Sequence, residues 1–174
     1  GVGASVRLLP LTLLATLAAL LVHVPAQGAR TGPEACVAPG IPYQPVRQAM
    51  FEQLNGYRIR HGLSPLRYSK TLELAADEQA LDMARRRFFD HENPDGERPP
   101  DRAARAGFCH RGVGENLAYG LNTRSTPAEA LQAWIESPGH EKNMRGDYQH
   151  VGMGAAHVVE NGNHAYYWVQ VFAR

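Results

Sequence analysis

A histidine at the start of a short helix is the first feature of this sequence that could do chemistry. The segment SPGH, residues 137–140, interrupts one helical pattern and begins another. With Ser137 as N-cap and Pro138 at the first helical position, His140 falls at the third. Unpaired backbone N–H groups and the positive end of the helix dipole disfavour imidazolium there, so a neutral ring is expected near pH 7. A neutral imidazole can bind a metal ion or accept a proton. The alternative is that His140 lies in the first turn of a helix and has no functional role.

Two further polar residues lie next to expected helix or strand ends. His91 follows a long helical pattern, in DHENPDG, which is rich in turn-forming residues. Glu115 lies in GENLA, between a glycine and an apolar stretch. Loop residues on a rigid scaffold often carry function, although each residue alone fits a surface position equally well. The chain contains no HExxH, GxSxG, phosphate-binding glycine loop or CxxC motif, so no common catalytic signature assigns a reaction.

Hydrophobic periodicity predicts the helices that position these residues. One helix is expected over residues 46–61, and a longer one from Ser69 as N-cap to about residue 89. A short helix in PPDRAARAGF ends at Gly107, and a capping box at Thr126 opens another before SPGH. On the long helix, the apolar stripe comprises Leu74, Leu81, Ala84 and Phe88, and the solvent face comprises Asp77, Glu78, Arg85 and Arg86.

Two segments with strand character close the chain. HVGMGAAHVVE and HAYYWVQVFAR flank the turn sequence NGN, which predicts a β-hairpin. Tyr166, Tyr167 and Trp168 of the second segment could line a ligand groove, or they could pack in the core. Helices followed by a terminal hairpin indicate an α+β domain.

The N-terminal residues predict export. Residues 1–26 carry Arg7 as their only charge, an apolar run from Leu8 to Val24, and small residues at the spacing that signal peptidase favours. We expect a cleaved signal peptide and a secreted protein with no integral membrane segment; the alternative is an N-terminal membrane anchor. Residues 27–45, rich in proline and glycine, are expected to form an irregular leader.

Charge and cysteine content narrow the possible partners. Without residues 1–26 the chain has 17 basic and 17 acidic residues, so charge gives no reason to expect nucleic acid or an anionic membrane as partner. In an exported protein, Cys36 and Cys109 are expected to form a disulfide. Closing that loop would stabilise the fold by about 4 kcal/mol on the chain-entropy model. The alternative is two free buried thiols.

Six segments in order give a more specific signal. FFDHENPDG, AGF, GVGENLAYG, AWIESPGHEKNM, HVGMGAA and YYWVQVF resemble the short bacterial form of the CAP superfamily, which includes cysteine-rich secretory, antigen 5 and pathogenesis-related proteins and is also called the SCP domain. The resemblance covers roughly residues 47–174, nearly the whole chain after the signal peptide, and the predicted domain is residues 46–174. It implies an α-β-α sandwich, with a small antiparallel sheet between helices and a central cleft lined by two histidines and acidic residues.

The resemblance also assigns cleft positions. It places His91, Glu115 and His140 in the cleft, whereas the glutamate usual three residues after the helix tryptophan is Ser137 here, with Glu136 as an uncertain substitute one position early. Two imidazoles and a carboxylate with an open coordination position suit Zn²⁺, so His91, His140 and Glu115 are predicted metal ligands. The alternative is a hydrogen-bonded network that only holds the cleft open.

The roles known in such a family do not transfer with the fold. They range from lipid or sterol binding to peptidase activity. We expect a non-enzymatic binding module for a small-molecule, lipid or cell-wall ligand. The alternative is a metal-dependent extracellular hydrolase acting on peptides or cell wall, for which only Glu136 or Glu141 is near enough in sequence to act as base.

Overall fold

The computed structural model describes residues 43–109 and 112–174. The predicted signal peptide and nearly all of the predicted leader lie outside these residues. The elements in chain order are α1 (Tyr43–Arg60), β1 (Arg67–Tyr68), α2 (Lys70–Arg86), α3 (Pro99–Arg105), β2 (Val113–Leu121), α4 (Pro127–Ile135), α5 (Pro138–Met144), β3 (His150–Glu160) and β4 (Asn163–Ala173).

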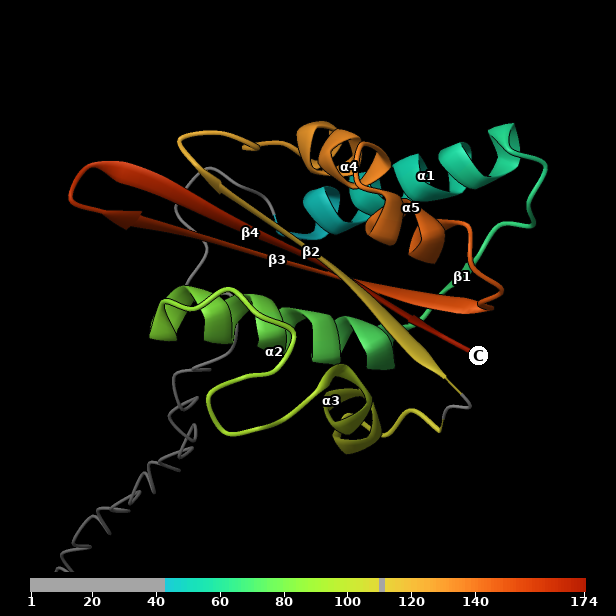
Figure 1. The fold of residues 1–174 in the computed structure, drawn as a ribbon, viewed down its shortest axis with the longest axis horizontal. Helices are drawn as coiled ribbons and strands as arrows, with labels where there is room; N and C mark the ends of the chain where they lie inside the picture. Colours follow the sequence, from blue (N-terminus) through green and yellow to red (C-terminus); the bar gives the residue numbers. More distant parts are fainter. Residues whose placement is uncertain (1–42, 110–111) are drawn as a thin grey trace, which may run out of the picture. The chain divides into compact units, whose positions relative to one another are not determined.

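The four strands form one sheet between two layers of helices. The strand order is β1-β3-β4-β2, which leaves β2 at one edge. The long pairings are antiparallel, whereas the two-residue β1 pairs parallel with β3. Helices α2 and α3 lie on one face of the sheet and α1, α4 and α5 on the other (Figure 1). The predicted α+β class and α-β-α sandwich are confirmed, and the sheet is mixed rather than purely antiparallel.

Each face of the sheet has its own hydrophobic core. On the α2 face, alanines of the helix pack against alternate residues of β2 and β4, including Ala76, Ala80, Leu117, Val169 and Val171. On the other face, larger side chains fill the space below α1 and α4, including Leu54, Trp134, Met153, Trp168 and Phe172. This alternation along the strands is the period of two that a sheet covered on both faces requires.

The hairpin and one close helix contact follow from glycines in the sequence. Asn161 and Gly162 join β3 to β4 with positive φ angles of 50° and 79°, as a two-residue turn of the primed type requires, so the predicted hairpin is confirmed. Gly152 and Gly154 of β3 face α2, and a Cβ atom at either would overlap the helix backbone near Leu72 or Ala76. These glycines let α2 lie directly against the strand.

Two predictions about the first two helices were wrong. Helix α1 begins at Tyr43, so the last three residues of the predicted leader are helical. On α2, Leu74 is 58% exposed and Asp77 is 3% exposed, the reverse of the prediction. Asp77 turns inward because Arg47 of α1 forms a buried ion pair with it. Periodicity within α2 cannot reveal a partner on another helix.

Helix α2 also ends earlier than expected. It stops at Arg86, and Arg87 takes a left-handed conformation with φ of 56°. The chain therefore leaves the helix before Phe88 and enters the segment that carries His91.

No helix in residues 43–109 or 112–174 has the length and apolar character needed to cross a lipid bilayer.

Candidate functional site

The edge strand β2 is the base on which the candidate site is built. Only β4 pairs with it along the sheet. Its residues 115, 117 and 119 point toward the α2 face by strand alternation, and Leu117 and Tyr119 pack there. The segment after α2 approaches β2 from this side, and α5 approaches from the other side of the sheet (Figure 1). The structure therefore brings His91 and Glu115, far apart in sequence, together.

His91 and Glu115 form the polar centre of the site. The Nδ1 atom of His91 lies 2.8 Å from Oε1 of Glu115. The Glu115 side chain is only 1% exposed, whereas that of His91 is 52% exposed. An ionised carboxylate can only accept, so Nδ1 carries the proton of this bond. No described residue hydrogen-bonds Nε2 of His91, which leaves that nitrogen for a ligand.

Arg102 of α3 hydrogen-bonds both Glu115 and His91. Its Nη2 atom donates to Oε2 of Glu115 at 2.9 Å and to the backbone oxygen of His91 at 3.0 Å. Its Nη1 atom donates to the backbone oxygen of Glu97 at 2.9 Å, and its side chain is 1% exposed. Both oxygens of Glu115 are thus engaged, and its buried charge is compensated.

No sequence pattern indicated that Arg102 belongs to the site. Arg102 and Ala103 are the buried residues of α3, and the sequence of this short helix contains no long apolar side chain that could fill the core in place of Arg102. From sequence, an arginine in a short helix is expected to face solvent. The structure shows that the Arg102 side chain is buried instead.

His140 takes the predicted place in α5. Ser137 is the N-cap and Pro138 the first helical residue, although the Ser137 side chain makes no capping hydrogen bond. The amide Nδ2 of Asn116 donates to the backbone oxygen of His140 at 3.1 Å. Burial lowers the pKa of His140, and the charge of His91 lowers it further. The direction is the predicted one, and burial of the ring is the larger of these two causes.

Side chains from neighbouring elements cap the free edge of β2. Each donates to one of the alternate backbone oxygens that point away from β4, which would otherwise be open to another strand. The donors are Asn143 of α5, Trp134 of α4 and Arg124 of the connecting loop, and the acceptors are the oxygens of residues 115, 117 and 119, at 3.1, 2.9 and 2.6 Å. Helices α4 and α5 are therefore fixed to the strand that carries Glu115.

Neither glutamate considered as a base faces the two histidines. Glu136 is exposed at the C-cap of α4, and its Oε1 atom accepts from Nε2 of Gln132 at 2.9 Å. Glu141 accepts from the hydroxyl of Tyr57 at 2.6 Å, a bond that lowers the pKa of the Glu141 carboxyl. The structure therefore joins His91 to Glu115 but brings neither Glu136 nor Glu141 into contact with them.

A metal ion would meet a smaller ligand set than predicted. In residues 43–109 and 112–174, no group of three or more His, Cys, Asp or Glu side chains is arranged to hold a metal ion. Glu115 has other partners at both oxygens, so it acts here as the group that orients His91, as carboxylates do behind metal-bound imidazoles. Its role as a direct ligand stays a prediction.

The predicted disulfide stays a prediction as well. Cys109 is exposed and makes no disulfide with a described residue. Its expected partner Cys36 lies outside the described residues.

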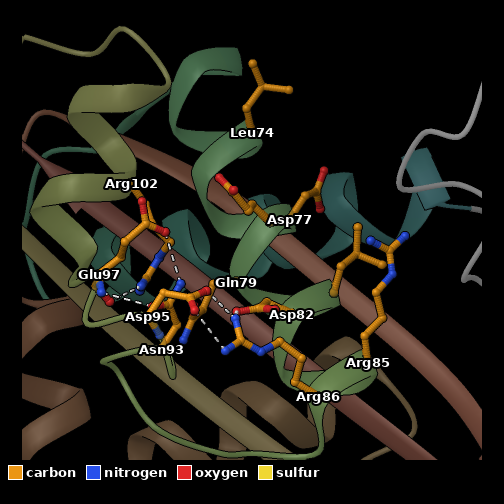
Figure 2. A pocket seen from close by; sticks show the side chains of 12 residues that line it. Leu74, Asp77, Gln79, Asp82, Arg85, Arg86, Asn93, Asp95, Glu97 and Arg102 are labelled. Atoms are coloured by element: carbon orange, nitrogen blue, oxygen red, sulfur yellow. Dashed lines mark hydrogen bonds and ion pairs between the residues drawn. The ribbon is translucent and has the colours of Figure 1, made fainter.

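A polar pocket of about 340 Å³ has Arg102 among its lining residues. Figure 2 shows Arg102, Asn93 and Glu97 on one side of it and Arg85 and Arg86 on the other. Arg86 of the lining forms ion pairs with two lining carboxylates, Asp95 and, at 3.5 Å, Asp82. Glu97 of the lining is paired at 3.0 Å with Arg105, which lies outside the lining. Arg102 therefore lines this pocket and also binds His91 and Glu115.

A second pocket, of about 240 Å³, is mainly aromatic. It is lined by Arg87, Phe88, Phe89, Tyr119, Leu121, Ala165 and Tyr167. Phe89 and Leu121 are about half exposed, at 50% and 48%. The ring of Tyr119 lies 5.9 Å from that of Phe89 and 5.0 Å from that of Tyr167, centroid to centroid. We call this group the aromatic pocket.

The predicted aromatic groove residues divide between the two faces of the sheet. Trp168 is buried on the α1 face, with its Nε1 atom donating to the backbone oxygen of Arg124 at 2.7 Å. Tyr166 lies on the same face and is half-buried. Tyr167 is buried on the opposite face, where it lines the aromatic pocket. One of the three residues therefore lines a pocket.

Comparison with known sequences places the chain in a family. Residues 51–172 match the CAP family, described as the cysteine-rich secretory protein family. The uncharacterized protein YkwD of Bacillus subtilis is 35% identical over 122 residues, which are 70% of this chain and 44% of YkwD. The uncharacterized membrane protein YlbC of the same organism is 32% identical over 101 residues, 58% of this chain and 28% of YlbC. The chain belongs to the CAP family, and it spans less than half the length of either relative.

Solved structures show the same fold. An extracellular protein containing an SCP domain from Bacillus anthracis matches with a TM-score of 0.66 and 28% identity, over 76% of this chain and 41% of that one. An outer surface protein of Borrelia burgdorferi matches with a TM-score of 0.66 and 21% identity, over 77% of this chain and 96% of that one. The likeness to the second protein concerns the fold alone.

Proposed function

We propose that this chain is an extracellular, non-enzymatic binding module that holds a small amphipathic ligand between the aromatic pocket and His91. The observation that carries the proposal is that the same two segments form both places. Residues 87–91 supply Phe88, Phe89 and His91, and β2 supplies Glu115 and Tyr119. The Bacillus anthracis relative is described as extracellular, which supports the location.

The spacing along β2 defines the size of ligand. Glu115 and Tyr119 are four residues apart on one strand, which is about 13 Å at the rise of a β-strand. The aromatic pocket has the apolar walls that small-molecule sites commonly have, and its volume suits a short acyl chain or a single ring. The uncommitted Nε2 of His91 offers a hydrogen-bonding partner for a polar head group.

Binding of decanoate below its micelle concentration tests this proposal. Phe89→Ala and Tyr119→Ala are each expected to weaken binding about tenfold, because each removes about 1.4 kcal/mol of apolar contact with the chain. Isothermal titration calorimetry measures the change. Ile59→Ala is the matched control, since Ile59 is an exposed apolar residue on α1, at 60% against 50% for Phe89. Equal losses in all three variants, or none in any, would contradict the proposal.

We further propose that the same site binds a divalent metal ion through His91 and His140. Two features support this: Nε2 of His91 has no partner among the described residues, and the pKa of His140 is lowered by burial and then by His91. Glu115 and Arg102 would hold the His91 ring in position. When bound, such an ion supplies a Lewis-acid centre, which is the one chemistry that would favour the hydrolase alternative.

Zinc titration at two pH values tests the metal proposal. Binding needs unprotonated imidazoles, and His140 takes up a proton only below the usual histidine range near 6.5. Affinity is therefore expected to be nearly constant above about pH 7.5 and to be much weaker at pH 5.5. His91→Ala and His140→Ala should each lose most of the binding, and Glu136→Gln should lose none. Equal zinc binding by all these variants would place the site elsewhere.

A further inference from the structure

Two histidines near the hairpin turn form a cluster separate from the site described above. His157 on β3 lies opposite Tyr166 of β4, and His164 lies opposite Val159, so the two histidines are diagonal neighbours on one face of the hairpin. The hairpin turn lies at the end of the sheet away from the C-terminus (Figure 1). Neither histidine contacts a residue of the His91 site in the described structure.

The two imidazoles are held close together. Nε2 of His157 lies 3.0 Å from Nδ1 of His164, and the two rings are inclined by 15°. The residue His157 is 6% exposed, and its ring stacks on Tyr166 with centroids 4.4 Å apart. His164 is exposed, and its backbone N–H donates to Oδ1 of Asn122 at 2.7 Å. One ring is therefore fixed, and the other can turn on a fixed backbone.

Only one nitrogen of His157 can reach a ligand. Its Nδ1 atom is buried and has no hydrogen-bond partner in the described part of the chain. Its Nε2 atom faces His164 near the turn of the hairpin. Any ligand of this pair must therefore lie between the two rings or beside their shared edge.

We propose that His157 and His164 together bind a divalent copper ion. An imidazole nitrogen binds a metal ion at about 2.0–2.1 Å. If two such nitrogens bind one ion with an N–metal–N angle of about 95°, they lie about 3 Å apart. Nε2 of His157 and Nδ1 of His164 have this separation, 3.0 Å. Tetragonal coordination by nitrogen and oxygen is typical of Cu²⁺, which also binds such ligands most strongly among the common divalent metals.

The proposed site has two protein ligands. Residues 43–109 and 112–174 offer no third His, Cys, Asp or Glu side chain in a metal-binding group, so water fills the remaining positions. Binding requires the ring of His164 to turn, and the proton shared by the two facing nitrogens moves to an outer ring nitrogen of the pair. The competing explanation is a hydrogen bond between two histidines that binds no metal.

Copper titration of the untagged full chain separates these explanations. The background variant carries His91→Ala and His140→Ala, so that the candidate site contributes no imidazole. Calorimetry and electron paramagnetic resonance are expected to show one Cu²⁺ with nitrogen coupling from two imidazoles. Adding His164→Ala should weaken binding at least about tenfold and remove part of the nitrogen coupling.

Two further variants complete the test. His61→Ala in the same background replaces another exposed histidine, in the turn after α1, and is expected to leave copper binding unchanged. His157→Phe keeps a flat ring against Tyr166 but removes the ligand, so it should lose copper as His164→Ala does. Because His164 is exposed, its variant is expected to fold, which circular dichroism checks. The proposal is overturned if His164→Ala binds Cu²⁺ with unchanged affinity and an unchanged spectrum.

Discussion

Replacing Arg102 by methionine is expected to lower the free energy of unfolding by about 3–5 kcal/mol. The guanidinium and the Glu115 carboxylate are each 1% exposed, so the variant leaves a buried negative charge without its partner. It also removes the donors to the backbone oxygens of His91 and Glu97. Urea denaturation followed by circular dichroism measures the change.

Arg105→Met is the matched control for this variant. Arg105 lies on the same helix as Arg102, but its side chain is 47% exposed and its partners Glu78 and Glu97 are partly exposed, at 44% and 34%. Exposed ion pairs contribute at most about 1 kcal/mol. Glu115→Gln, added to Arg102→Met, should restore part of the loss because it removes the uncompensated charge. If Arg102→Met costs no more than Arg105→Met, the buried ion pair is not what holds His91 and Glu115 in place.

Gly154→Ala is expected to lower the free energy of unfolding by about 3 kcal/mol, the upper end of the range for overpacking a core. The new methyl group would overlap the backbone of α2 at Ala76, and backbone cannot move aside as a side chain can. Separating α2 from β3 would also displace the segment after α2, which carries Phe89 and His91. Thermal and urea denaturation measure the loss.

Gly139→Ala provides the comparison for this prediction. Gly139 lies inside α5, and a Cβ atom there would meet nothing within 4 Å. Alanine favours a helix over glycine by up to about 1 kcal/mol, so this variant should be neutral or slightly more stable. The close-packing explanation fails if both glycine variants change stability by the same amount.

Local patterns predicted the elements of this fold well. The NG turn predicted the hairpin, the Thr126 capping box predicted the start of α4, and SPGH predicted the start of α5. Each depends on residues close together in sequence, where backbone preferences and neighbouring side chains decide the structure. The resemblance to the CAP family then supplied the layers, which local patterns alone do not define.

Contacts between distant segments could not be predicted in the same way. Asp77 is buried because Arg47 of another helix reaches it, and Arg102 is buried because Glu115 needs a partner. Trp134 and Asn143 donate to the edge of β2, so their roles depend on where α4 and α5 lie. Each case is a polar group whose partner is set by tertiary structure, which hydrophobic periodicity does not report.

The most direct test of the proposed function is to map where decanoate binds by amide chemical shifts in a two-dimensional ¹H–¹⁵N spectrum. We expect the largest shifts in residues 87–91 and in β2 from residue 115 to 121, the two segments that form the aromatic pocket and hold His91. Largest shifts around Ile59 of α1, or in the polar pocket beyond Arg102, with both of those segments unchanged, would contradict it.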